Sequence, residues 1–313
     1  MSENSLDEIL AALRAAGEET RLRILALFRS GELTVTELVT ILRQSQPRVS
    51  RHLKLLCEAG LLERHREGTW IFYRLAEQGG PGNLARAVLD FIPWSDQLLQ
   101  HDQERLTEVK RERTDRAAEY FRQNAVNWDK IRSLYISEKD VESLLLELTS
   151  DMEIDTLLDV GTGTGRMLEV FASRINRGIG IDLSREMLSV ARVNLEKAKV
   201  GNCQIRHGDM YDLALPDETI DLVLFHQVLH FADDPLSALK ETSRLLKKDG
   251  RAVIVDFAPH ELEFLRQEHA HRRLGFSDQE IRGWCRQVGL MCDDMITLKG
   301  TELDVSVWVA RKK

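Results

Sequence analysis

The sequence is poor in cysteine. Cys57, Cys203, Cys285 and Cys292 are the only four among 313 residues, and no two of them stand in Cys-x-Cys or Cys-x-x-Cys spacing. Such pairs mark many structural zinc sites and redox motifs, and dense cysteine frameworks mark small secreted domains. We therefore expect no bound metal, and we expect free or buried thiols in a reduced, cytoplasmic protein.

The sequence also lacks long apolar segments. No run approaches the roughly 18 residues that a membrane-spanning helix needs, so we expect no membrane partner. The opening residues MSENSLDEIL have neither the basic nor the apolar region of a secretory signal. A chain of 313 residues with 43% hydrophobic and 30% charged residues is typical of a globular protein with about two domains.

Positive charge is scarce in the chain as a whole, because the formal net charge is -8. Residues 43–74 depart from this balance, with seven basic against three acidic side chains and a local net charge of +4. An acidic protein with one small basic face keeps contacts to phosphates while it limits nonspecific DNA binding. The charge distribution therefore favours a local DNA-binding surface.

Helical periodicity around this window predicts a helix-turn-helix. Three helices are expected first: Leu6–Ala16, Glu18–Phe28 and Val35–Leu42. A further helix should begin near Pro47, because proline is favoured in the first helical turn. In that helix Val49, Leu53 and Leu56 share one side and should face the core. The candidates for contacts to phosphates and base edges in a major groove are Gln46, Arg48, Ser50, Arg51 and Lys54.

After Gly60, the segment LLERHREGTWIFYRL predicts a β-hairpin whose arms carry Arg64 and Arg66, two further candidates for DNA contacts. The runs ETRLRILALF and SQPRVSRHLKLLCEAGLLE, together with this wing, resemble the ArsR/SmtB family of bacterial repressors over Leu6–Leu75. The resemblance implies a winged-helix homodimer that binds double-stranded operator DNA. A winged helix used only for protein contacts is the alternative.

One position departs from the metal-sensing members of that family. These members often carry a Cys-x-Cys pair on the helix before the turn, where this chain has Thr34 and Thr36 in the run ELTVTEL. A hydroxyl does not supply the soft thiolate that arsenite, cadmium or zinc sites of that kind use. We therefore do not expect a metal ion as the effector.

A glycine-rich turn predicts a nucleotide-type site. In LLDVGTGTG, residues 157–165, an apolar strand ends in a turn that opens a helix. Gly161, Gly163 and Gly165 reach positive φ without strain and let a ligand lie against the backbone. Asp182 ends a second apolar strand, where a carboxylate can accept both hydroxyls of a ribose.

The runs LLDVGTGTG, GIDLS and RHGDM together resemble the class I S-adenosylmethionine (SAM)-dependent methyltransferases, especially the UbiE-like small-molecule group. The resemblance implies SAM or S-adenosylhomocysteine (SAH) as cofactor, with Asp182 on the ribose, Asp209 on the adenine amino group and Met210 against the adenine face. A strand-end turn aspartate is the alternative for Asp209. The other cofactor-binding candidates are Asp159, Gly161, Thr162, Gly163, Gly165, Leu183 and His226.

Alternating strands and helices over residues 157–257 predict a doubly wound, Rossmann-like α/β sheet, and two final strands predict an antiparallel edge hairpin. We expect a winged-helix domain at 1–80, a helical connector that also serves dimerisation at 81–130, and a SAM-binding domain at 131–313. The run AAEYFRQNAVNWDKI resembles the segment that covers the SAM pocket in UbiE-like domains. Tyr120, Phe121 and Trp128 are candidates to line that pocket, and aromatic core packing is the alternative.

The run LFHQVLHF ends the fourth strand of this domain. Enzymes that methylate DNA amino groups typically have DPPY or NPPY there, so we do not expect DNA methylation. His230 is the candidate catalytic base, because imidazole titrates near neutral pH. The alternative is that His230 lines the pocket without a catalytic role.

The two resemblances together predict a cytoplasmic, DNA-binding transcription regulator that responds to SAM or SAH, with methionine-cycle genes as targets. The alternative is an active SAM-dependent methyltransferase that acts on a small metabolite, with autoregulatory DNA binding.

Overall fold

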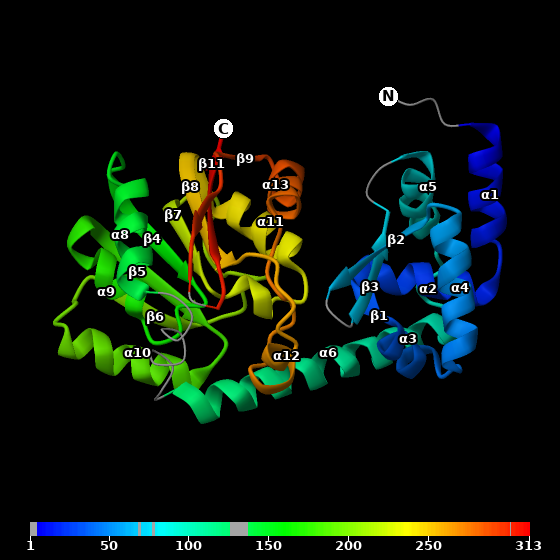
Figure 1. The fold of residues 1–313 in the computed structure, drawn as a ribbon, viewed down its shortest axis with the longest axis horizontal. Helices are drawn as coiled ribbons and strands as arrows, with labels where there is room; N and C mark the ends of the chain where they lie inside the picture. Colours follow the sequence, from blue (N-terminus) through cyan, green and yellow to red (C-terminus); the bar gives the residue numbers. More distant parts are fainter. Residues whose placement is uncertain (1–4, 68–69, 77–78, 126–136, 301) are drawn as a thin grey trace. The chain divides into compact units, whose positions relative to one another are not determined.

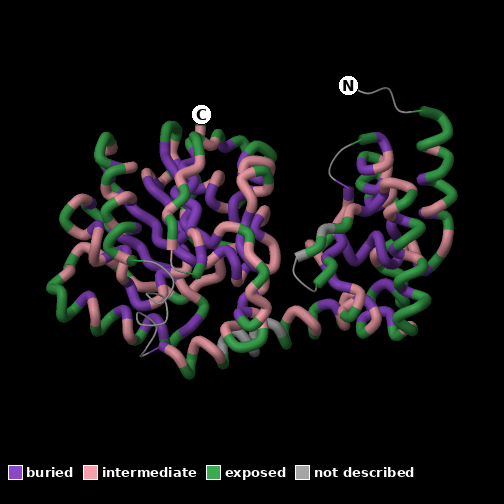
Figure 2. The backbone as a smooth tube through the Cα atoms, viewed as in Figure 1, coloured by how far each residue is buried: buried purple, intermediate pink, exposed green. Residues whose placement is uncertain are grey.

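The computed structural model describes residues 5–67, 70–76, 79–125, 137–300 and 302–313. The chain divides into two compact units, Met1–Asp115 and Arg116–Lys313 (Figure 1). This division falls inside residues 81–130, the segment that the sequence assigned to a separate connector. Each unit has its own buried interior (Figure 2). Among the described residues, no helix has the length and apolar character to cross a membrane.

The first unit is a winged helix. Its helices are α1 (Leu6–Ala16), α2 (Glu19–Leu27), α3 (Val35–Leu42), α4 (Gln46–Glu58) and α5 (Gly79–Asp90). Its strands are β1 (Leu33–Thr34), β2 (Leu62–Glu67) and β3 (Trp70–Leu75), in the order β1-β3-β2. The antiparallel hairpin of β2 and β3 pairs Leu62 with Leu75. These elements confirm the predicted helix-turn-helix and wing.

Thr34 begins helix α3 as its N-terminal cap. Its hydroxyl accepts a hydrogen bond from the backbone N–H of Glu37 at 3.4 Å, and the Glu37 carboxylate accepts the Thr34 N–H at 2.8 Å. This reciprocal pair is a capping box, which satisfies backbone donors that the helix itself leaves free. The Thr34 hydroxyl therefore has a structural role here.

Helix α6 (Gln97–Asn124) begins in the first unit and ends in the second. Near its start, the buried carboxylate of Asp102 accepts two hydrogen bonds from the Arg23 guanidinium in α2, at 2.7 and 2.9 Å. Arg105 donates to the same carboxylate at 3.1 Å and to the carbonyl oxygen of Ile41 in α3 at 3.0 Å. The first half of α6 is therefore held to both α2 and α3.

The second unit is built on an eight-stranded sheet. Its main helices are α8 (Glu138–Leu148), α9 (Arg166–Phe171), α10 (Arg185–Lys197), α11 (Pro235–Leu245), α12 (Phe264–Glu268) and α13 (Asp278–Gln287). Its strands are β4 (Ile154–Val160), β5 (Ile175–Asp182), β6 (Cys203–His207), β7 (Ile220–His226), β8 (Leu246–Phe257), β9 (Leu290–Cys292), β10 (Ile296–Leu298) and β11 (Val305–Lys312). The order is β10-β11-β8-β7-β4-β5-β6, with β9 paired to β11.

Helices cover both faces of this sheet (Figure 1). Leu158 and Val160 of β4 pack in a core shared with α11 and α13, whereas Leu157 packs on the other side with α8 and α9. Strands β4 to β8 pair in parallel, and β11 is antiparallel to β8. The structure therefore confirms the doubly wound α/β fold with an antiparallel edge, and it places the carboxyl ends of β4, β5, β6 and β7 at one edge of the sheet.

The interaction between Arg23 and Asp102 yields a stability prediction. Asp102→Ala should lower the free energy of unfolding of the first unit by about 3 to 5 kcal/mol, because it removes the carboxylate that hydrogen-bonds the buried guanidinium of Arg23 and leaves the exposed Glu19, at 3.9 Å, as a more distant counter-charge. Urea unfolding of the full chain, followed by circular dichroism, measures this decrease. Glu108→Ala, which removes an exposed ion pair with Arg111 on the same helix, should cost at most about 1 kcal/mol. Equal decreases in the two variants would contradict the prediction.

Candidate functional site

Helix α4 presents the predicted DNA-binding side chains to solvent. Val49, Leu53 and Leu56 are fully buried on its inner side. The five predicted α4 candidates are all exposed: Gln46, Arg48, Ser50, Arg51 and Lys54. Arg64 and Arg66 on strand β2 are exposed as well, while Gly68 and Thr69, which lie between the two arms of the hairpin, are outside the described residues. The winged helix therefore offers a polar, mainly basic surface on one helix and one wing strand.

The glycine turn between β4 and α9 is held in shape by strand β5. The N–H groups of Gly161 and Thr162 both donate to the carbonyl oxygen of Ile181, at 2.8 and 3.0 Å. All three glycines of the turn have positive φ: 68° at Gly161, 52° at Gly163 and 81° at Gly165. The turn therefore needs glycine at these positions, as the sequence predicted.

Asp182, the last residue of β5, also supports this turn. One carboxylate oxygen accepts the N–H of Gly163 at 2.9 Å, and the other accepts the N–H of Ser184 at 2.8 Å. Burial raises the pKa of the Asp182 carboxyl, and these backbone hydrogen bonds oppose that shift. The next residue, Leu183, is 47% exposed. Asp182 is thus a positioning residue for the turn, at the strand end where a ribose contact was predicted.

Asp159 and Thr162 interact beneath the turn. Asp159 is 2% exposed, and its carboxylate accepts a hydrogen bond from the Thr162 hydroxyl at 2.6 Å. This hydrogen bond joins the end of β4 to the first turn residues. The two predicted residues are therefore together in the structure.

Asp209 forms a tight turn after β6. Its carboxylate accepts the N–H of Tyr211 at 3.0 Å, and its carbonyl oxygen accepts the N–H of Asp212 at 3.2 Å. Met210 is half-buried against the core. These contacts are those of a turn aspartate, the alternative interpretation of Asp209, and the adenine contact stays a prediction.

Tyr211 is a residue that sequence reasoning missed. Its hydroxyl accepts the N–H groups of Asp233 and Asp234, at 2.8 and 3.1 Å, and burial raises its pKa. The phenol thereby ties the turn after β6 to the start of α11. The signal available in the sequence was an aromatic residue directly after the run RHGDM at the end of a strand.

Strand β7 ends beside the glycine turn. His226 is buried, and its Nε2 lies 3.9 Å from a carboxylate oxygen of Glu138. A Cβ atom added to Gly161 would lie only 2.2 Å from a methyl group of Val228. Val228 therefore packs directly on the turn, and only glycine fits beneath it. Sequence reasoning missed Val228 and its neighbour Gln227, although both follow the carboxyl end of a central strand.

His230 is paired with a buried carboxylate. It lies in the short 3-10 helix η4 (Leu229–Phe231), and its Nδ1 is 2.7 Å from Asp256 Oδ1. The backbone N–H of His230 also donates to Asp256 Oδ2, at 3.2 Å. Asp256 is fully buried near the end of β8. A carboxylate in this position fixes the orientation of an imidazole ring, so that the other ring nitrogen is left to accept a proton.

Rings from two other segments surround His230. His271 stacks on it with ring centroids 4.1 Å apart. In the second half of α6, the Tyr120 hydroxyl lies 2.7 Å from His269 Nδ1, and Phe121 contacts Phe231 edge to face at 4.8 Å. The predicted aromatic candidates Tyr120 and Phe121 are therefore near His230, while Trp128 lies outside the described residues.

Burial lowers the pKa values of the histidines around His230. The pKa of His260 falls to about 4, and that of His271 falls well below its usual range. Burial also lowers the pKa of His269. These three side chains are therefore neutral at pH 7, and the surroundings of His230 are rich in aromatic and neutral imidazole rings.

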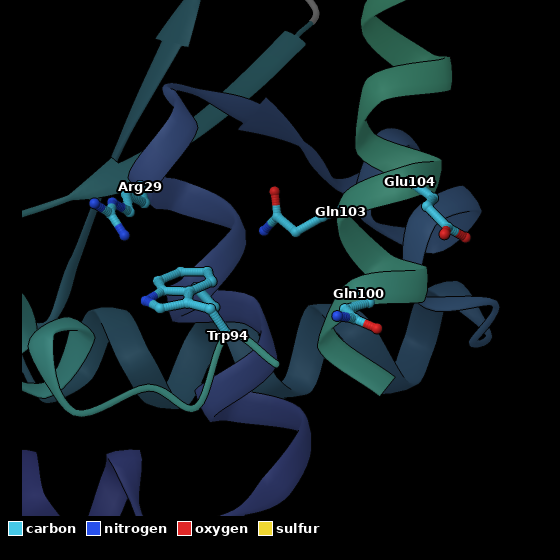
Figure 3. Close-up of a pocket in the computed structure, with 6 residues that line it drawn as sticks. Arg29, Trp94, Gln100, Gln103 and Glu104 are labelled. Carbon is cyan, nitrogen blue, oxygen red and sulfur yellow. The ribbon is translucent and has the colours of Figure 1, made fainter. Parts of the chain in front are cut away.

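A separate cavity of about 690 Å³ lies in the first unit, between α2 and the start of α6 (Figure 3). The Arg29 guanidinium lies 4.9 Å from the centroid of the Trp94 ring, and Gln100, Gln103 and Glu104 complete the polar lining. No predicted site residue lines this cavity. A second hollow of about 610 Å³ lies among α8, α9 and α10, lined in part by Glu142 and Arg166.

Comparison with known proteins assigns both units. Residues 18–64 match the model of the bacterial regulatory proteins of the arsR family, and residues 158–254 match a methyltransferase domain. The arsenical resistance operon repressor of Escherichia coli is 53% identical over 60 residues, 19% of this chain and 51% of that protein. An uncharacterized methyltransferase of Schizosaccharomyces pombe is 30% identical over 182 residues, 50% of this chain and 66% of that protein.

The fold of the second unit has solved counterparts. The crystal structure of the YcgJ protein from Bacillus subtilis matches with a TM-score of 0.50 at 19% identity, over 56% of this chain and 99% of that chain. The chain is therefore a fusion of a region that matches the arsR family of bacterial regulatory proteins and a region that matches a methyltransferase domain and has the fold of such domains. It spans 51 to 66% of the length of the two curated relatives, so these comparisons assign domains and leave the activity of the whole protein open.

The residues at the carboxyl ends of the strands fit a SAM-type nucleoside. Glycine is required at Gly161, the Asp182 carboxylate ends β5, and Gln227 brings a buried amide to the end of β7. The Nε2 of Gln227 has no hydrogen-bond partner among the described residues. These features together suit a polar ligand that lies across the strand ends.

The lowered histidine pKa values predict a pH-dependent stability. The unfolded chain binds more protons than the folded chain below the unfolded histidine pKa of about 6.5. The second unit should therefore lose stability as the pH falls from about 6.5 towards the pKa of His260, about 4. Each such group contributes up to about 1.4 kcal/mol per pH unit in that window.

Urea unfolding between pH 5 and pH 8 measures this dependence. His271→Phe keeps a ring in the stack and removes one histidine whose pKa is lowered. The free energy of unfolding of this variant should therefore fall less steeply as the pH decreases. His207→Phe, at an exposed position on β6, is the matched control. A slope in His271→Phe as steep as in the control would refute the assignment.

Proposed function

We propose that this protein is an ArsR-type transcription regulator whose affinity for operator DNA changes when SAM or SAH binds at the glycine turn. The observation that carries the proposal is helix α6, which is anchored in both units. Asp102 pairs with Arg23 in the first unit, and Tyr120 contacts His269 in the second. One helix thus connects the winged helix to the rings around His230.

The exposed surface of the first unit supports DNA binding by a homodimer. Leu6, Leu10 and Leu13 are 74%, 37% and 46% exposed, at spacings that place them on one side of α1. Two copies joined through such an apolar stripe would bury it and present two α4 helices to successive major grooves. Arg48, Arg51 and their neighbours then supply the contacts to phosphates and base edges.

The second unit supplies the ligand site. In this proposal the Asp182 carboxylate accepts the ribose hydroxyls, and the glycine turn lets the nucleoside approach the backbone. SAM brings a transferable methyl group on a sulfonium, and SAH is the same nucleoside without that methyl group and charge. Because SAM and SAH are made and consumed in the methionine cycle, the genes of that cycle are the proposed targets. The proposed location of the regulator is the cytoplasm.

A second candidate function is supported by the His230–Asp256 pair. In an active methyltransferase, His230 would accept the proton of a small-molecule acceptor while Asp256 holds its ring in place. The winged helix would then regulate the gene of the enzyme itself. The chain's own residues would bind the nucleoside in the same way in both functions.

The DNA-binding surface can be tested by its salt dependence. Arg51→Ala should reduce the slope of log affinity against log salt concentration by about one for each phosphate that the variant no longer neutralises. The probe is a duplex selected from random sequence by the wild-type protein, titrated at several salt concentrations. Arg192→Ala, an exposed arginine on α10, should leave slope and affinity unchanged. An unchanged slope for Arg51→Ala would place the DNA elsewhere.

Regulation predicts that SAM and SAH shift the affinity for the same duplex by different amounts. Coupling between sites is typically about 1 to 3 kcal/mol, roughly a 5- to 150-fold change. Fluorescence anisotropy with saturating SAM, saturating SAH or neither measures the shift. Asp182→Ala should bind DNA like the wild type and respond to neither nucleoside.

The same samples distinguish the two candidate functions. A DNA affinity that neither bound SAM nor bound SAH changes would rule out the regulator. Methyl transfer to a small metabolite that His230→Ala abolishes would then establish the enzyme.

A further inference from the structure

Gln227 has a backbone conformation that its side chain does not favour. Six non-glycine residues among those described have positive φ, and Gln227 is one of them, with φ of 53°. Four of the others are exposed and Ala270 is half-buried, whereas Gln227 is 6% exposed. Strained conformations of this kind persist where the surroundings enforce them, and they cluster at binding and catalytic sites.

The side chain of Gln227 destabilises the folded state in a second way. Its Nε2 is buried without a hydrogen-bond partner among the described residues, although its backbone N–H donates to the Val255 carbonyl oxygen at 2.8 Å. A buried donor without an acceptor destabilises the folded state. Strain and an unsatisfied amide at one residue together indicate a ligand that supplies the missing acceptor.

The order of the strands shows which part of the ligand reaches Gln227. Asp182 ends β5 and Gln227 follows β7, with β4 and its glycine turn between them. Two strand spacings separate them, roughly 10 Å. A nucleoside whose ribose lies at Asp182 and which crosses the glycine turn therefore brings its amino-acid end to Gln227.

We propose that the Gln227 amide donates a hydrogen bond from Nε2 to the carboxylate of the amino-acid end of SAM or SAH. The proposal rests on the nucleoside site proposed above. It selects the carboxylate because an amide NH₂ group only donates, and the ammonium group of the ligand offers no acceptor. Gln227 is thereby a specificity residue that distinguishes nucleosides with an amino-acid end from those without one.

Calorimetry with SAH and 5′-methylthioadenosine tests this hydrogen bond, because the second probe keeps the adenosine and the sulfur and lacks the amino-acid end. Gln227→Leu should weaken SAH binding about 10- to 100-fold, the range for a hydrogen bond to a charged group, and leave 5′-methylthioadenosine unaffected. Gln227→Glu should weaken SAH further, because it sets a carboxylate against the ligand's carboxylate.

Three results would overturn the assignment. The first is an equal affinity for SAH in the wild type and Gln227→Leu, and the second is an equal loss of affinity for SAH and 5′-methylthioadenosine in Gln227→Leu. The third is tighter SAH binding by Gln227→Glu, which would indicate that residue 227 contacts the ammonium group instead. A wild-type protein that binds neither probe would overturn the proposed nucleoside site itself. The failure of each proposal is therefore distinguishable.

Melting temperatures give a readout that does not depend on the leucine variant. Gln227→Gly relieves the strained φ and removes the unpaired amide, so the ligand-free protein should melt at a higher temperature while the upward shift caused by SAH shrinks. Lys199→Gly, at an exposed residue with φ of 56°, is the matched control and should keep the full SAH shift. A full SAH shift in Gln227→Gly would show that the side chain contacts no ligand.

Discussion

The end of strand β5 fixes the backbone of the glycine turn, on which the candidate ligand site depends. Ile181 accepts the N–H groups of Gly161 and Thr162, and the next residue, Asp182, accepts those of Gly163 and Ser184. The glycine turn after β4 and the start of α10 therefore share one short anchor. Because burial raises the pKa of the Asp182 carboxyl, its charge depends on these backbone donors, and a ribose with two hydroxyl donors would stabilise the same charge.

The parts of the molecule that sequence analysis predicted are those with local signals. Val49, Leu53 and Leu56 repeat at helical spacing. The glycines of the turn, Gly161 among them, indicate positive φ because glycine adopts it without strain. Asp256 and Asp102 carry no such signal, because their partners lie 26 and 79 residues away. Gln227 was missed for another reason: its strain and its unpaired amide exist only in the folded chain.

Helix α6 illustrates how a segment rich in charged residues is held in place. The sequence predicted a helical connector over residues 81–130 and gave no signal for the residues that contact it within the chain. The structure shows polar and aromatic contacts near both ends, from Asp102 and Arg105 in the first unit to Tyr120 and Phe121 in the second. Breaking a buried charge pair is costly, so the Arg23–Asp102 pair holds the first half of α6 in one position on α2.

SAM and SAH differ only in the methyl group and the sulfonium charge, and this limits where a sensor can distinguish them. The proposed contacts of Asp182 with the ribose and of Gln227 with the carboxylate would be common to both nucleosides, so they would give affinity without discrimination. A ligand shifts an equilibrium only through unequal affinity for the two states. In the proposed pose the sulfur of the ligand, which carries the methyl group in SAM, would lie between these two ends. From His230, the rings of His271, His269 and Phe231 lead to Tyr120 and Phe121 on α6. A regulator that distinguishes the two nucleosides through α6 would therefore use the same rings that surround the candidate catalytic base.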